Sequence, residues 1–197
     1  MKSKRWRITL LVMAAVTALG SCELLYAPFN QMTIGDTSYP LSSVYVYEHT
    51  DLPGALTLLI MSTGLSVTGS QGETISGKGD YLALTLTNAT GTLEKGTYTF
   101  AAATPPAIAP LLSFAVVGYD ADLNEEDEGY FVGGGTIVVR TLIGGGYSIE
   151  ILLEGGTADE LNSSDPPEQW VWPTSTQITG RFRGDVSQTF RGSFFVR

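Results

Sequence analysis

Residues 147–154 read Tyr-Ser-Ile-Glu-Ile-Leu-Leu-Glu, and this stretch decides the fold of the chain. Apolar side chains at positions 147, 149, 151 and 153 alternate with polar ones at 148, 150 and 154. A period of two with one polar face is typical of a strand in an antiparallel sheet whose other face is buried. Gly144-Gly145-Gly146 comes directly before the strand and predicts a tight hairpin to the preceding apolar run.

The same kind of pattern continues outward from this strand. Tyr81–Thr87 and Gln177–Arg183 also alternate, and Gly184-Asp185 predicts a closing hairpin from the second of these to residues 189–196. Four further segments are apolar on both faces and are expected to be central strands: Val44–Thr50, Ala55–Met61, Leu112–Tyr119 and Thr136–Thr141. We therefore predict an all-β domain, a single antiparallel β-sandwich or flattened barrel of about nine or ten strands.

The N-terminal segment has a different composition. Four of its first seven residues are basic, and Ile8 to Leu19 then supplies twelve uncharged residues. A helix of that length spans roughly 18 Å against about 30 Å of hydrocarbon, so the segment fits a signal peptide better than a membrane span. It ends on Leu19-Gly20-Ser21-Cys22, and Cys22 is the one cysteine of the sequence.

This ending resembles the lipobox of bacterial lipoproteins, in which a branched apolar residue and two small residues precede a cysteine. The resemblance covers residues 1–22. It implies that Cys22 receives a lipid and that a peptidase cuts before it, which would tether the chain to a membrane of the bacterial cell envelope. The alternative is an ordinary secretory signal with an incidental cysteine. The expected organisation is a signal peptide over residues 1–21, a lipidated cysteine and short tether over 22–30, and the all-β domain over 31–197.

Cleavage would change the charge of the chain. The mature chain would keep seven Lys and Arg against twenty Asp and Glu, a formal net charge of −13. Such a balance argues against a nucleic-acid partner and against docking of the protein surface onto anionic lipid. We therefore expect contact with the membrane through the lipid on Cys22, and a glycan or an envelope protein as a further partner.

The residues needed for common catalytic sites are scarce. His49 is the one histidine, whereas a Ser-His-Asp triad needs an imidazole beside a serine and a carboxylate, and zinc needs several His or Cys ligands. His49 has the same strand parity as Tyr45 and Tyr47, so we expect a strand-end histidine at the rim of a sheet. The sequence predicts no enzyme.

One acidic segment partly matches a calcium loop. Asp120, Asp122 and Asn124 occupy positions 1, 3 and 5 of the pattern. The pattern then fails, because Glu125 stands where the turn needs glycine and Phe131 where a bidentate glutamate is needed. The segment is either a solvated acidic loop or a weak Ca²⁺ site, and no other cofactor is expected.

Two further features are candidate binding surfaces. Trp170 and Trp172 follow a double proline, and in an extended chain they share one side, where they can stack on a sugar or peptide or pack at the rim of the core. Arg181 and Arg183 share one face of their strand and form a basic strip with Arg191 and Arg197 on the next. This strip either pairs across strands with Glu150 and Glu154 or captures an acidic glycan or partner.

The sequence thus favours a lipid-anchored protein with a non-catalytic binding or structural β-domain. One alternative is a calycin-like barrel that holds a small apolar ligand, which would require an unfilled interior. A second alternative is a surface module that binds carbohydrate or calcium.

Overall fold

The computed structural model describes residues 28–70, 74–100, 111–122, 129–157 and 175–192. Within these ranges the regular structure consists of strands, and no helix there is long and apolar enough to cross a membrane. The strands are β1 (Gln31–Ile34), β2 (Thr37–Pro40), β3 (Ser43–Glu48), β4 (Ala55–Met61), β5 (Leu65–Thr68), β6 (Thr74–Thr87), β7 (Gly96–Phe100), β8 (Leu111–Asp122), β9 (Gly129–Thr141), β10 (Tyr147–Thr157), β11 (Thr176–Gly184) and β12 (Gln188–Arg191).

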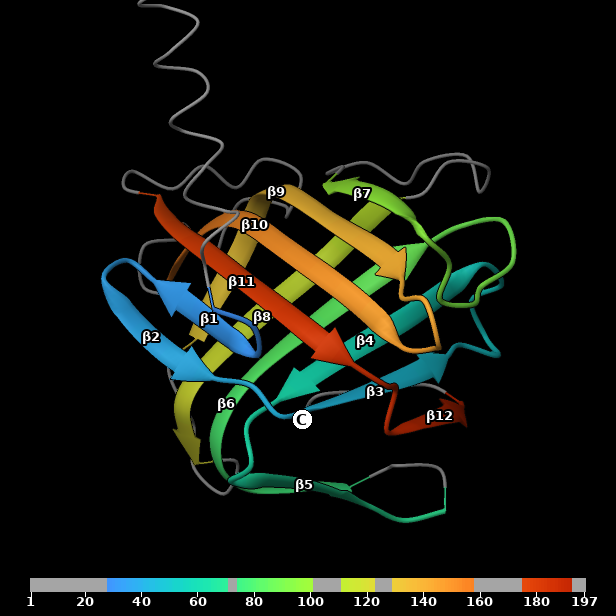
Figure 1. The fold of residues 1–197 in the computed structure, drawn as a ribbon, viewed down its shortest axis with the longest axis horizontal. Coiled ribbons are helices and arrows are strands. Elements are labelled where there is room, and N and C mark those ends of the chain that lie inside the picture. The colour runs from blue at the N-terminus through green and yellow to red at the C-terminus, as the bar shows by residue number, and fades with distance from the viewer. Residues whose placement is uncertain (1–27, 71–73, 101–110, 123–128, 158–174, 193–197) are drawn as a thin grey trace, which may run out of the picture.

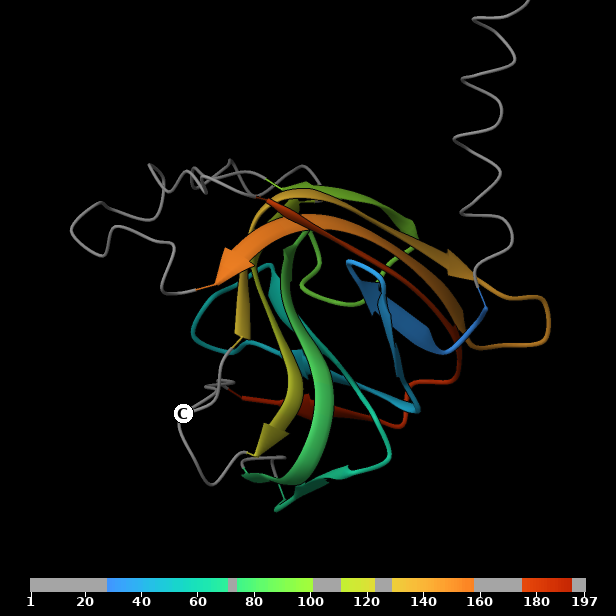
Figure 2. The same ribbon diagram turned by 90° about the vertical axis from the view of Figure 1, so that its left-hand side faces the viewer.

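The strands form one continuous sheet that curls over on itself into a flattened barrel (Figures 1 and 2). Its order is β12-β3-β4-β6-β8-β7-β9-β10-β11-β1-β2, and β5 pairs with the first half of β6 outside this path. One wall contains β3, β4 and β6, and the opposite wall contains β9, β10, β11 and β1 (Figure 1). The all-β prediction is confirmed.

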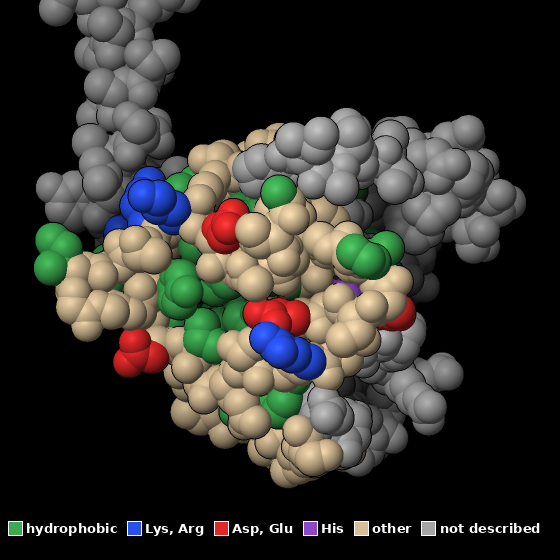
Figure 3. Space-filling model, turned by 90° about the vertical axis from the view of Figure 1, so that its right-hand side faces the viewer, with side chains coloured by type: hydrophobic (Ala, Val, Ile, Leu, Met, Phe, Trp, Pro, Cys, Tyr) green, Lys and Arg blue, Asp and Glu red, His purple; other side chains and the backbone are tan. Residues whose placement is uncertain are grey.

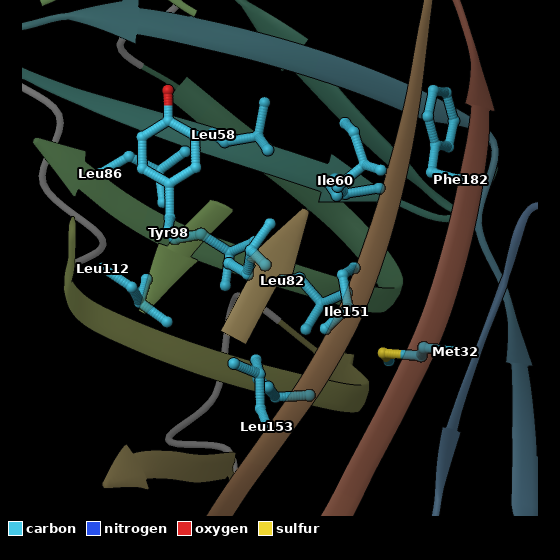
Figure 4. Close-up of a cluster of buried hydrophobic side chains, with 14 of the residues drawn as sticks. Met32, Leu58, Ile60, Leu82, Leu86, Tyr98, Leu112, Ile151, Leu153 and Phe182 are labelled. Carbon is cyan, nitrogen blue, oxygen red and sulfur yellow. The ribbon is translucent and has the colours of Figure 1, made fainter. Parts of the chain in front are cut away.

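The main core lies between the two walls, where side chains from both converge (Figure 4). The predicted inward faces of two strands are confirmed at Leu82, Leu84 and Leu86 from β6 and at Ile149, Ile151 and Leu153 from β10, whereas Tyr147 is only partly buried against the core. The six leucine and isoleucine side chains are fully buried. The period of two in the sequence therefore correctly indicated which face of each strand is buried.

A second apolar group, here called the outer cluster, lies outside the barrel against β3, β4 and β6. It consists of Tyr47, Leu59, Met61, Leu65, Ala83 and Phe190. Phe190 of β12 stacks on the ring of Tyr47, with 5.0 Å between the ring centroids. The outer cluster and the main core together bury β4 along its whole length, which confirms the prediction of a strand covered on both faces.

The predicted closing hairpin is wrong. β12 does not return along β11 but pairs in parallel with β3, in the register Gln188 to Tyr45. The physical reason is that both edges of β11 are already occupied, one by β10 and the other by β1. Gly184 therefore ends β11 without starting a hairpin.

β7 and β8 form a second parallel pair. At one end of the sheet β8 pairs directly with β9, in antiparallel orientation, through Val116 to Gly118. At the other end β7 lies between β8 and β9 and is antiparallel to β9. The described residues therefore form a mixed sheet of twelve strands, more than the nine or ten that the sequence predicted.

Candidate functional site

The first described residues of the chain are held by hydrogen bonds along the edge of β11 that β1 occupies. The backbone N–H of Asn30 donates to the carbonyl of Arg181 at 2.6 Å, and the Asn30 side-chain Oδ1 accepts the backbone N–H of Arg183 at 2.8 Å. The carbonyl of Asn30 accepts the N–H of Leu41 at 2.8 Å. Asn30 has a φ of 60°, a left-handed conformation that asparagine tolerates better than most residues.

An aromatic ring covers two arginines at the same place. The Arg181 guanidinium carbon lies 4.2 Å from the centre of the Phe29 ring, and that of Arg183 lies 5.5 Å from it. These distances suit cation–π attraction, which is worth about 0.5–1 kcal/mol at exposed sites and more where water is excluded. Phe29 remains 42% exposed, so its outer side faces solvent.

A carboxylate lies between two arginines below this ring. Glu150 of β10 is the register partner of Arg181, and its Oε1 lies 3.6 Å from Arg181 Nη2 and 2.8 Å from Arg140 Nη1. The side chain of Arg181 is 11% exposed and that of Arg140 is 54% exposed. We call Phe29, Arg140, Glu150, Arg181 and Arg183 together the arginine corner.

The contacts of the arginine corner test the two interpretations of the basic strip, pairing with carboxylates or capture of an acidic partner. The cross-strand pairing of Arg181 with Glu150 is confirmed. Arg183 differs, because its side chain is exposed and no carboxylate of the described residues is within ion-pair distance of it. The exposed guanidinium groups of Arg140 and Arg183 are therefore the donors that this face offers to an anionic group.

The second half of the predicted basic strip is placed differently. Arg191 Nε contacts Glu48 Oε2 at 3.1 Å, not Glu150 or Glu154, because β12 lies beside β3. Arg197 lies outside the described residues. A continuous strip of four arginines along a closing hairpin is therefore wrong, and Arg181 and Arg183 form a separate group.

His49 takes part in a hydrogen-bonded chain at the end of β3. Its Nε2 lies 2.9 Å from Thr57 Oγ1, which lies 3.2 Å from Thr85 Oγ1, and its Nδ1 lies 3.9 Å from Asp51 Oδ1. The order carboxylate, imidazole, hydroxyl matches that of a nucleophilic triad. Thr57 is 2% exposed, however, so no external substrate reaches this hydroxyl. The chain of contacts stabilises the strand ends, as expected for a histidine at the rim of a sheet.

The acidic segment is described only in part. Asp120 and Asp122 belong to β8, where the backbone of Asp122 pairs with that of Lys78, and Asn124 lies outside the described residues. Within the described ranges, no three His, Cys, Asp or Glu side chains gather closely enough to hold a metal ion.

Three other predicted site residues also lie outside the described residues: Cys22, Trp170 and Trp172. Phe29 and Asn30, in contrast, are residues that sequence reasoning assigned to the tether. Their partners Arg181 and Arg183 stand about 150 positions further along the chain, so no local spacing indicates the contact. An aromatic residue next to an asparagine just before the first strand was the available signal.

Comparison with known proteins adds no functional assignment. No family model, curated protein or solved structure matches this chain. The interpretation of function therefore depends on the residues and contacts described above.

Proposed function

We propose that this chain is a lipid-anchored protein of the bacterial cell envelope, whose β-domain acts by binding through its surface and not by catalysis. The proposal combines the lipobox at Cys22 with the fixed start of the domain at Phe29 and Asn30. A tether that ends on a sheet, and not in a further linker, limits how far the domain can lie from its anchor.

The observation that carries the choice of a surface role is the packing of the main core. Large side chains from both walls meet in the interior, among them Met32, Leu58, Tyr98 and Phe182 (Figure 4). Each of these four is at most 3% exposed. A barrel that carries a small apolar ligand needs interior volume that its own side chains leave free. The packing therefore favours the binding module over the calycin-like alternative.

Lipidation is tested by metabolic labelling of bacterial cells with a clickable fatty acid, followed by cell fractionation. We expect label and membrane association in the natural chain and in Ser21→Ala, which keeps a small residue before the cysteine. We expect neither in Cys22→Ser, while its circular dichroism retains the β-sheet signal. Label that persists in Cys22→Ser contradicts the anchor, and loss of the sheet signal shows instead that Cys22 is needed for folding.

The surface role is tested by titrating the protein with a fluorescent fatty-acid analogue. We expect no saturable binding by the natural chain. Saturable binding at one site per chain that unlabelled fatty acid displaces would support the ligand-carrying barrel and refute the surface role.

A further inference from the structure

The arginine corner and the β9–β10 hairpin lie at the same edge of the barrel. The register places Arg140 of β9 and Arg183 of β11 level with each other, on either side of Ser148 in β10. Two strand spacings separate them, about 10 Å. The turn that follows Arg140 is therefore adjacent to the point where Phe29 crosses Arg181 and Arg183.

This edge also carries exposed apolar side chains. Phe29 and Ile143 are two of the three exposed large hydrophobic residues of the described part of the chain, and the third, Leu52, lies in the turn between β3 and β4. Ile143 is fully exposed at the tip of the hairpin, where Gly144, Gly145 and Gly146 all have positive φ. In Figure 3, basic and hydrophobic side chains are exposed at the left-hand side of the molecule, and acidic side chains are exposed on the same face.

The charge of this edge differs from that of the chain as a whole. Arg140, Arg181 and Arg183 stand against Glu150 and against Asp185, whose Oδ1 lies near the backbone of Gly146. Three positive and two negative groups leave a formal surplus of one positive charge. The predicted mature chain carries −13, so the local charge balance of this edge is opposite in sign to that of the chain as a whole. Arginine guanidinium groups are suited to phosphate, and anionic headgroups attract such clusters.

The length of the tether determines which partner meets this edge. Seven Cα–Cα steps lead from Cys22 to Phe29, so the lipid attachment is at most about 25 Å from the arginine corner. A domain of this size is about 40 Å across. The tether is therefore shorter than the domain, and the edge that holds its end is the part of the domain held nearest to the membrane.

We propose that Phe29, Ile143 and the arginine corner form a membrane-docking edge, which contacts the anionic lipid headgroups of the membrane that holds the anchor. Ile143 and the outer side of the Phe29 ring enter the interfacial region, and Arg140 and Arg183 contact lipid phosphates. This inference rests on the proposed lipidation of Cys22 and adds to it the orientation of the domain.

The experiment uses the fact that Cys22 is the one cysteine of the sequence. Lipidation would occupy the thiol of Cys22, so a cysteine introduced elsewhere is the single site for a fluorescent label. The full-length variants Ile143→Cys and Asp36→Cys are purified from membranes, labelled, and reconstituted into vesicles of phosphatidylglycerol and brominated phosphatidylcholine. Asp36 is the matched control, because it is also an exposed turn residue. It follows the end of β1, whereas Phe29 and the docking edge lie at the start of that strand.

We expect bromine to quench the label at position 143 severalfold more than the label at position 36. Replacing phosphatidylglycerol by zwitterionic lipid, or adding Arg183→Ser, should reduce the quenching at position 143. If the mass of the protein includes the lipid, equal quenching at the two positions, or none at either, overturns the docking edge. The proposed lipidation of Cys22 then still stands. A protein whose mass lacks the lipid overturns the proposed function together with the docking edge.

Discussion

Replacing Glu150 by glutamine tests how strongly the arginine corner holds the start of the domain. Glutamine keeps the shape of the side chain and removes the charge that lies between Arg140 and Arg181. The contact with Arg140 is on the surface, since that arginine is 54% exposed, and such pairs contribute under about 1 kcal/mol. The contact with Arg181 is different, because the side chain of Arg181 is only 11% exposed.

The magnitude follows from this difference. At 3.6 Å and an effective dielectric constant of about 20, the attraction between the two charges is about 4–5 kcal/mol. Glu150 is 26% exposed, so solvent screens part of this energy, and the Phe29 ring continues to face Arg181 in the variant. We therefore expect Glu150→Gln to lower the free energy of unfolding by about 2 kcal/mol.

Urea unfolding followed by fluorescence measures this loss, in a Cys22→Ser background that lacks the lipid. With a slope of about 2 kcal/mol per molar urea, the midpoint should fall by about 1 M. The matched control is Arg140→Gln, which removes the surface contact alone and should cost under about 1 kcal/mol. A midpoint in Glu150→Gln no lower than in Arg140→Gln would show that Arg181 does not depend on this carboxylate, and the reasoning would fail.

Three further predictions, two of them with a control substitution, test the fold by the same urea titration. Leu58→Ala in the main core should cost about 2–5 kcal/mol, whereas Leu52→Ala at an exposed turn should stay within about 0.5 kcal/mol; equal losses would contradict the assignment of the core. Gly135→Ala places a Cβ against the backbone carbonyl oxygen of Leu152 in β10 and should destabilise the chain by more than Gly144→Ala does. The Cβ of Gly144→Ala meets no atom within 4 Å, so this control bears only the left-handed penalty of about 1–2 kcal/mol. Asn88→Ala removes a buried amide that accepts three hydrogen bonds and donates two, and a loss below about 1 kcal/mol would show that this amide does not hold its turn.

The part of the fold that sequence predicts well is the part encoded locally. The alternation around Ile149 and Leu84 depends on neighbouring residues, and a one-residue shift would expose every apolar side chain of the strand. Gly144 to Gly146 likewise specify their hairpin locally, since all three adopt positive φ. These elements are in the structure where the sequence predicts them.

The part that sequence predicts poorly depends on competition between distant strands. Gly184 has the chemistry of a hairpin turn, yet β1 from the start of the chain occupies the edge of β11 that a hairpin would need. The contacts of Phe29 and Asn30 with β11 depend on distant strands in the same way, because they require β1 to pair with β11. Pairings of this kind are set by which edges remain free in the assembled sheet, and a single sequence does not encode that locally.

A lipid tether at Cys22 would make a small docking edge sufficient. A headgroup region within about 25 Å of the anchor corresponds to an effective concentration of roughly tens of millimolar, so a contact of millimolar affinity is occupied most of the time. A contact made by two exposed apolar side chains and two exposed arginines is consistent with millimolar affinity. A protein without a lipid anchor would need a much larger contact to stay on a membrane. The net negative charge of the predicted mature chain then assists the orientation, because an anionic membrane repels the domain as a whole. The lipid would supply the attachment, and the arginine corner would determine which surface of the barrel stays available to a partner.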